Sequence, residues 1–173
     1  MYQIKNNIIR VITVVAVTAM MTMASCNNQN SNNMDMTEKK NETAIFPQGE
    51  KASETVFTGT AFLNMLISDN DSIFNCQVYD VVFEPSARNN WHSHPGGQIL
   101  LVTAGKGYYQ ERGKEARLLQ RGDVVEILPD VVHWHGAAPD SKFTHIGISP
   151  NTQKGGAAWF EAVSDEDYKK ATK

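Results

Sequence analysis

The chain has 173 residues, with 16 basic and 19 acidic side chains and a formal net charge of −3 at pH 7. Its length suits one domain accompanied by additional segments. Nucleic-acid-binding proteins neutralise phosphates with clustered Lys and Arg. The acidic balance of this chain therefore argues against a nucleic-acid partner.

The first 25 residues have the composition of an export signal. Lys5 and Arg10 precede or flank an apolar run, Val11–Ala24, that is too short for a comfortable membrane span. Ala-Ser stands directly before Cys26, which resembles a bacterial lipoprotein signal, although Met23 occupies a place where Leu is commoner. The resemblance implies lipidation of Cys26 and anchoring in a membrane, facing the periplasm or cell surface. The alternative is an ordinary cleaved signal peptide on a secreted or periplasmic soluble protein.

Residues 26–44 are polar, rich in Asn and without a hydrophobic period, which predicts a flexible tether. Loss of residues 1–25, which hold two basic side chains, would leave 148 residues with a net charge of −5. With Cys26 acylated only Cys76 remains, so no intramolecular disulfide can form. The fold must then rest on its apolar core.

The stretch from residue 45 to 163 alternates short runs of β-branched and aromatic residues with turn signals, which predicts an all-β domain. About eight strands in little more than a hundred residues favour a small β-barrel or jelly roll. The expected strands are Val56–Ile67, Phe74–Phe83, Gln98–Thr103, Gly107–Arg112, Ala116–Gln120, Val124–Leu128, Val132–Gly136 and Phe143–Ile148. In the last segment, 164–173, Ser164 followed by acidic residues predicts a short helix to about Ala171.

The five histidines all fall between positions 92 and 145, and four of them form two His-x-His pairs, His92/His94 and His133/His135. Alternate residues of extended backbone share one face, so each pair presents two imidazoles together. The same period places Gln98 alongside the first pair. Two such strands facing each other across a small barrel can converge on one ion.

Two stretches resemble the motifs of the cupin superfamily: SARNNWHSHPGGQILLVTAG, from Ser86 to Gly105, and GDVVEILPDVVHWHGA, from Gly122 to Ala137. With Thr144-His145-Ile146 they are similar to single-domain type-2 cupins of the quercetin-dioxygenase-like group and cupins associated with carboxymuconolactone decarboxylases. The resemblance implies a double-stranded β-helix. Ser86 and Asp130 replace motif glycines, and Asp tolerates left-handed backbone, so the second turn should still form.

Carried onto this sequence, the motifs imply that His92, His94, Gln98 and His133 bind one divalent transition metal, which could be Fe, Mn, Ni, Co, Cu or Zn. Gln98 stands where the family usually has glutamate, and its alternative role is to orient a histidine. If Gln98 is a ligand, the ligand set is neutral and the ion keeps its full charge. Such an ion favours an anionic oxygen ligand such as an enolate, a carboxylate or a phenolate.

His135 and His145 are the candidates for acid–base catalysis, because an ordinary histidine pKa of about 6.5 permits proton transfer near neutrality. Their alternatives are packing in the sheet and hydrogen bonding at its rim. We expect them to act beside the metal rather than on it.

Three hypotheses for function follow. The first is a metal-dependent cupin enzyme that oxidises, isomerises or cleaves a small oxygenated molecule. The second is a noncatalytic, surface-tethered binder of metal or a small ligand, favoured by the absence of a clear carboxylate base. The third is a structural or interaction module. A homodimer is expected in each case, because the strand edge at Val56–Ile67 would otherwise be exposed.

Overall fold

The computed structural model describes residues 44–68 and 73–173. The expected signal segment and nearly all of the expected tether, including Cys26, lie outside the described residues. Within the described ranges, no helix is long and apolar enough to cross a membrane.

Short strands dominate the described chain. They are β1 (Glu50–Lys51), β2 (Phe57–Thr58), β3 (Ala61–Ile67), β4 (Cys76–Phe83), β5 (Arg88–Asn89), β6 (His92–Ser93), β7 (Gln98–Glu111), β8 (Arg117–Gln120), β9 (Val124–Ile127), β10 (His133–Ala137), β11 (Phe143–Pro150) and β12 (Ala158–Trp159). A 3-10 turn, η1 (Thr152–Lys154), and one helix, α1 (Asp165–Ala171), complete the set.

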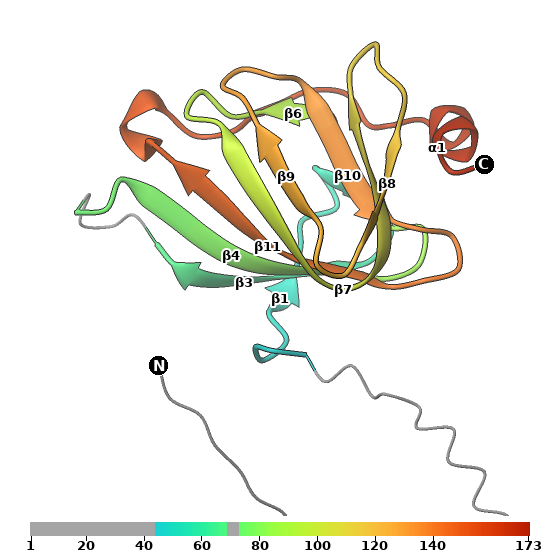
Figure 1. Cartoon of the computed structure of the whole chain (residues 1–173), viewed down its shortest axis with the longest axis horizontal. Coiled ribbons are helices and arrows are strands. Elements are labelled where there is room, and N and C mark those ends of the chain that lie inside the picture. The colour runs from blue at the N-terminus through green and yellow to red at the C-terminus, as the bar shows by residue number, and fades with distance from the viewer. Residues whose placement is uncertain (1–43, 69–72) are drawn as a thin grey trace, which may run out of the picture. The chain divides into compact units, whose positions relative to one another are not determined.

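Strand β7 joins the two halves of a curled antiparallel sheet (Figure 1). Its first half pairs with β9 and β11, and its second half pairs with β8 and β10. Beyond β11 the order runs through β4 and β3 to β1, and beyond β10 it runs through β5 to β2. The all-β, barrel-type fold and the C-terminal helix expected from the sequence are confirmed.

The expected turn between Gln98–Thr103 and Gly107–Arg112 is wrong, because both segments belong to the continuous strand β7. Gly105 has a φ of 71°, and the register of β11 against β7 shifts between Thr144 and His145. A Cβ at Gly105 would collide with the Lys142 carbonyl oxygen. Glycine therefore makes an irregularity that bends one long strand from one half-sheet into the other.

The barrel interior changes from apolar to polar along β11. Its buried positions alternate, from Phe143 through His145 to Ser149. Phe143 belongs to a core with Phe83, Leu100 and other buried apolar residues. Burying each such side chain contributes about 1.5–3 kcal/mol before conformational entropy is counted. This apolar base supports the polar residues farther along the interior.

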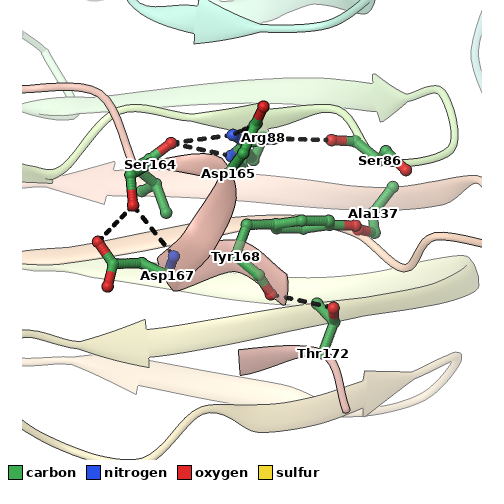
Figure 2. Close-up of polar contacts among 9 residues, drawn as sticks. Ser86, Arg88, Ala137, Ser164, Asp165, Asp167, Tyr168 and Thr172 are labelled. Atoms are coloured by element: carbon green, nitrogen blue, oxygen red, sulfur yellow. Dashed lines mark hydrogen bonds and ion pairs between the residues drawn. The ribbon is translucent and has the colours of Figure 1, made fainter. Parts of the chain in front are cut away.

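Helix α1 packs on the outside of the barrel through Tyr168, whose ring lies 5.9 Å from that of buried Trp134. The Tyr168 hydroxyl donates to the Ala137 carbonyl oxygen over 2.6 Å, and Ser164 caps the helix by accepting from the Asp167 N–H (Figure 2). Ser164 is thus the helix start that the sequence predicts.

Two turns have the left-handed backbone conformation expected at glycine positions of the cupin motifs, although this sequence has Ser86 and Asp130 there. Ser86 has a φ of 67° and Asp130 a φ of 63°, both in the left-handed region. The expectation that Asp130 preserves its turn is met by this geometry.

Candidate metal centre

Three histidines meet at one end of the barrel interior. His92 on β6 and His133 on β10 are register partners, and their ring centroids are 4.1 Å apart. His94 follows β6 in a turn that Gly97 closes, with its N–H donating to the His94 carbonyl oxygen and a φ of 83°. The His94 ring lies 5.2 Å from that of His92 and 6.0 Å from that of His133.

Backbone carbonyls fix which nitrogen of two histidines is free. Nδ1 of His92 lies 2.9 Å from the Asn90 oxygen, and Nδ1 of His133 lies 2.9 Å from the Val131 oxygen. A carbonyl only accepts, so Nδ1 carries the proton in both rings and Nε2 keeps its lone pair. Nε2 of His94 is buried and has no hydrogen-bond partner among the described residues. Each imidazole thus has an Nε2 available for an ion.

Gln98 turns its amide oxygen toward the same place. Its Nε2 donates to the Tyr79 hydroxyl over 2.6 Å, which leaves Oε1 at 2.9 Å from Nε2 of His133. Gln98 Oε1 and His133 Nε2 are both acceptor atoms, and they face each other. Two ligand atoms bound at about 2.1 Å and at a right angle would lie about 3 Å apart. The donor set of His92, His94, Gln98 and His133 therefore fits one divalent transition-metal ion.

The site keeps its imidazoles neutral. Burial lowers the pKa of His94 and His133 to about 4, and it lowers the pKa of His92 well below its usual value. The histidines also oppose one another's protonation, because each would place a positive charge beside the next. An ion would therefore displace no proton from these nitrogens near pH 7.

His135 lies close enough to join the cluster, since one nitrogen each of His92, His133 and His135 falls within 4.8 Å of the others. An amide donor already occupies its edge: Asn89 Nδ2 lies 3.0 Å from Nε2 and 3.3 Å from Nδ1 of His135. The donor repels a cation at this edge. Hydrogen bonding therefore distinguishes His135, whose nitrogens face an amide donor, from His94, whose Nε2 has no partner among the described residues.

The pKa near 6.5 expected for His135 and His145 is wrong. Burial lowers the pKa of His145 to about 4 and that of His135 well below its usual range. His135 lines the cavity, whereas His145 lies behind it with the ring centroids 4.7 Å apart. Neither nitrogen of His145 has a side-chain hydrogen-bond partner in the described part of the chain. The two form a neutral, buried imidazole pair beside the expected ligands.

A cavity of about 390 Å³ opens over the cluster. His92, His94, Gln98 and His135 are among the residues that line it. Its lining also includes six large apolar side chains: Phe57, Leu63, Met65, Val81, Phe83 and Trp159. The cavity therefore suits a small molecule that carries both polar and apolar groups.

Sequence reasoning missed Tyr79 and Ser149, which also line the cavity. Ser149 lies four residues after His145 on β11, and both are buried on the same face. The two-residue period would have pointed to Ser149. Tyr79 has no such marker, because its strand β4 contains no histidine.

Comparison with known proteins assigns the family. The cupin domain profile matches residues 79–146. The chain is 41% identical over 114 residues to (R)-mandelonitrile lyase of Granulicella tundricola, a match that covers 66% of this chain and 86% of the relative. The chain belongs to the cupin family.

Solved structures agree with this cupin assignment. A cupin-like protein from Thermotoga maritima is 61% identical, with a TM-score of 0.74, and the match covers 75% of this chain and 97% of that one. A predicted oxalate decarboxylase from the same organism is 18% identical with a TM-score of 0.52, covering 57% of this chain and 88% of that one. The second similarity concerns the fold alone.

Proposed function

We propose that this cupin is a metal-dependent lyase that breaks a carbon–carbon bond beside a hydroxyl-bearing carbon in a small molecule. Oxidation, isomerisation and lyase chemistry all suit the sequence. The relative named (R)-mandelonitrile lyase, at 41% identity, favours the last. Mandelonitrile is an α-hydroxynitrile with a phenyl ring, and the cavity offers both polar and apolar side chains to such a molecule.

The observation that carries the proposal is the 2.9 Å approach of two acceptors, His133 Nε2 and Gln98 Oε1, beside the unpartnered His94 Nε2. A divalent ion held there would act as a Lewis acid on a substrate oxygen. The four neutral side chains leave the charge of the ion uncompensated, which favours substrate oxygens that become negative during the reaction.

The residues of the chain supply the remaining steps. Apolar residues of the cavity lining hold the hydrocarbon end of the substrate, and His135, the member of the imidazole pair that lines the cavity, takes the hydroxyl proton. The carbon–carbon bond then breaks, its electron pair leaves with the nitrile carbon, and the oxygen-bearing carbon becomes an aldehyde. The proton returns from the imidazole pair to the cyanide. Atoms and charge balance with hydrogen cyanide and an aldehyde as products.

The test is purified domain loaded with each of the six candidate metals and supplied with both enantiomers of mandelonitrile. We expect about one ion per chain and release of benzaldehyde. Alanine at His92, His94 or His133 should lower metal affinity by at least about tenfold. Phe160→Ala is the control, because Phe160 lies outside the cavity. Full metal content in all three histidine variants would disprove the site.

A noncatalytic binder is the second candidate. The described residues that line the cavity include no Asp or Glu, so no carboxylate base faces the ligand. Stoichiometric metal and tight anion binding without turnover on α-hydroxynitriles or on a panel of enediol, phenolic and dicarbonyl compounds would favour this role.

We further propose that the protein is exported, lipidated at Cys26 and dimeric. The export-type segment before Cys26 supports the first two statements. Strand β1 pairs with β3 only at Phe62 and Leu63, and the exposed apolar side chains of Met65 and Ile67 beyond them support the third. Cys26→Ser should abolish labelling by a fatty-acid analogue. A monomeric mass at every concentration in light scattering would contradict the dimer.

A further inference from the structure

Two hydroxyl groups lie side by side in the cavity wall. The Tyr79 hydroxyl oxygen on β4 is 3.0 Å from Ser149 Oγ on β11, and both residues line the cavity. Gly147 is the register partner of Tyr79, and a Cβ there would collide with the tyrosine ring. The missing side chain allows the ring to lie across β11 and reach Ser149 and Gln98.

Each hydroxyl oxygen of the pair also lies within hydrogen-bond distance of a nitrogen atom of a neighbouring side chain. Gln98 Nε2 donates to the Tyr79 oxygen over 2.6 Å. His94 Nδ1 lies 3.4 Å from Ser149 Oγ. If His94 binds an ion through Nε2, its Nδ1 carries the proton and donates to Ser149.

In that arrangement, the four side chains hold one more hydrogen-bond donor than their contacts with one another can use. The Tyr79 and Ser149 hydroxyls own two protons, and only one of them can lie between the two oxygens. The two outer neighbours, Gln98 Nε2 and His94 Nδ1, are both donors and can accept nothing. One hydroxyl proton therefore has no acceptor within this group of four side chains.

We propose that the Tyr79–Ser149 pair presents this proton to a negatively charged oxygen of the substrate. The inference rests on the proposed function and narrows it, because it selects molecules that place a carboxylate or developing alkoxide at the site. A fixed neutral donor stabilises such charge without the cost of reorganising water.

The test uses cobalt(II)-loaded protein and two small probes whose binding is followed by visible absorption. Acetate can accept a hydrogen bond, whereas a bound imidazole offers only an N–H. In the double variant Tyr79→Phe with Ser149→Ala, acetate affinity should fall at least about tenfold, as for a lost hydrogen bond to a charged group. Imidazole affinity should stay unchanged.

Each single variant keeps one hydroxyl, so each should lose less acetate affinity than the double variant. Tyr109→Phe is the matched control, because Tyr109 is another buried interior tyrosine, with its ring 5.7 Å from that of His133. A second double variant, Tyr79→Phe with Ser149→Cys, is used if the first does not fold. Cysteine fills the space of the serine side chain better than alanine does, and its S–H is only a weak hydrogen-bond donor.

Unchanged acetate affinity in the double variant would overturn the inference and leave the metal-dependent function intact. Parallel loss of acetate and imidazole, or loss of cobalt, would also overturn it, since the hydroxyls would then only position Gln98 and His94. A wild-type protein that binds no cobalt would overturn the proposed function together with the inference.

Discussion

Asn89 holds His135 by both backbone and side chain. Its Oδ1 accepts the His135 backbone N–H over 2.9 Å, while its Nδ2 lies 3.0 Å from Nε2 of the ring. Because the backbone N–H can only donate, the amide orientation is fixed, and a donor must face the imidazole. The contact joins β5 to β10 directly beside the expected ligands.

Asn89→Asp should raise the pKa of His135. The substitution replaces a donor with a carboxylate, which favours the imidazolium that burial now opposes. Proton-detected NMR of the imidazole signals across pH 3–8 would measure the shift in metal-free protein. Asn89→Ala removes the donor without adding charge and serves as the control. An equal pKa in the Asp and Ala variants would contradict the contact.

The metal-free domain should lose stability as the pH falls from about 6.5 toward about 4. His94 and His133 have folded-state pKa values lowered to about 4 by burial, whereas unfolded histidines titrate near 6.5. Protonation then favours the unfolded chain throughout that window. Urea unfolding at several pH values would show this slope. A saturating metal should protect the domain, and flat stability from pH 7 to 4 would contradict the buried, neutral assignment.

Gln98→Glu should tighten metal binding and weaken the binding of anions. A carboxylate in place of the amide puts a negative charge beside the ion and reduces the charge that an anionic ligand meets. Tyr79 would then donate to this side chain instead of accepting from it, since the contact is only 2.6 Å long. Metal affinity by competition with a chelator and acetate affinity should move in opposite directions. No change in either would remove Gln98 from the ligand set.

The overall architecture could be predicted from local sequence patterns. Alternation in β3, β4 and β11, turn residues between strands and the Ser164 cap were sufficient to predict a barrel with a terminal helix. The two-residue strands β1, β5, β6 and β12 were missed, because two residues cannot show a period. The expected strand Val56–Ile67 is divided into β2 and β3. The Ala104–Gly107 segment has turn composition, but long-range pairing with β10 and β11 keeps it in strand β7.

The sequence was sufficient to predict which side chains gather at the candidate site, but not how burial changes their pKa values. Alternation and the cupin motifs bring out His92, His94, Gln98 and His133. Their lowered pKa values depend on burial beneath other elements, which no local pattern reveals. The hydroxyl of Tyr79 reaches Gln98 only because Gly147, far along the chain, leaves room for the ring.

Trp159→Ala should reduce selectivity for aromatic ligands. The Trp159 ring stacks on His92 with centroids 4.7 Å apart and lines the cavity with 41% of its surface exposed. Loss of an aromatic partner should weaken benzoate relative to acetate by about tenfold in cobalt-loaded protein. Phe160→Ala is closely matched, since Phe160 is adjacent and equally exposed but lies outside the cavity. An equal benzoate-to-acetate ratio in both variants would contradict an aromatic wall.

Arg88 binds the C-terminal segment to the barrel. Replacing Arg88 should lower the free energy of unfolding far more than replacing Asp165, its ion-pair partner. The buried guanidinium donates twice to the Val163 carbonyl oxygen, at 3.2 and 2.9 Å, and lies 4.6 Å from the Tyr168 ring centroid. It also forms an ion pair with Asp165, the first residue of α1, over 2.6 Å. Figure 2 draws both residues beside the start of the helix. Arg88→Met should lower the free energy of unfolding by about 2–4 kcal/mol, because a buried carbonyl loses its donors.

Asp165→Asn is the comparison, because Asp165 is exposed and water screens its charge. The Arg88 guanidinium lowers the pKa of Asp165, so the ionic contribution is present above the ordinary carboxyl range and disappears as the pH falls through the lowered value. Urea unfolding at pH 7 should therefore give a clearly smaller loss for Asp165→Asn than for Arg88→Met. Equal losses would mean that the ion pair, rather than the bonds to Val163, fastens the helix. Metal affinity should be the same in both variants, since α1 contributes no cavity residue.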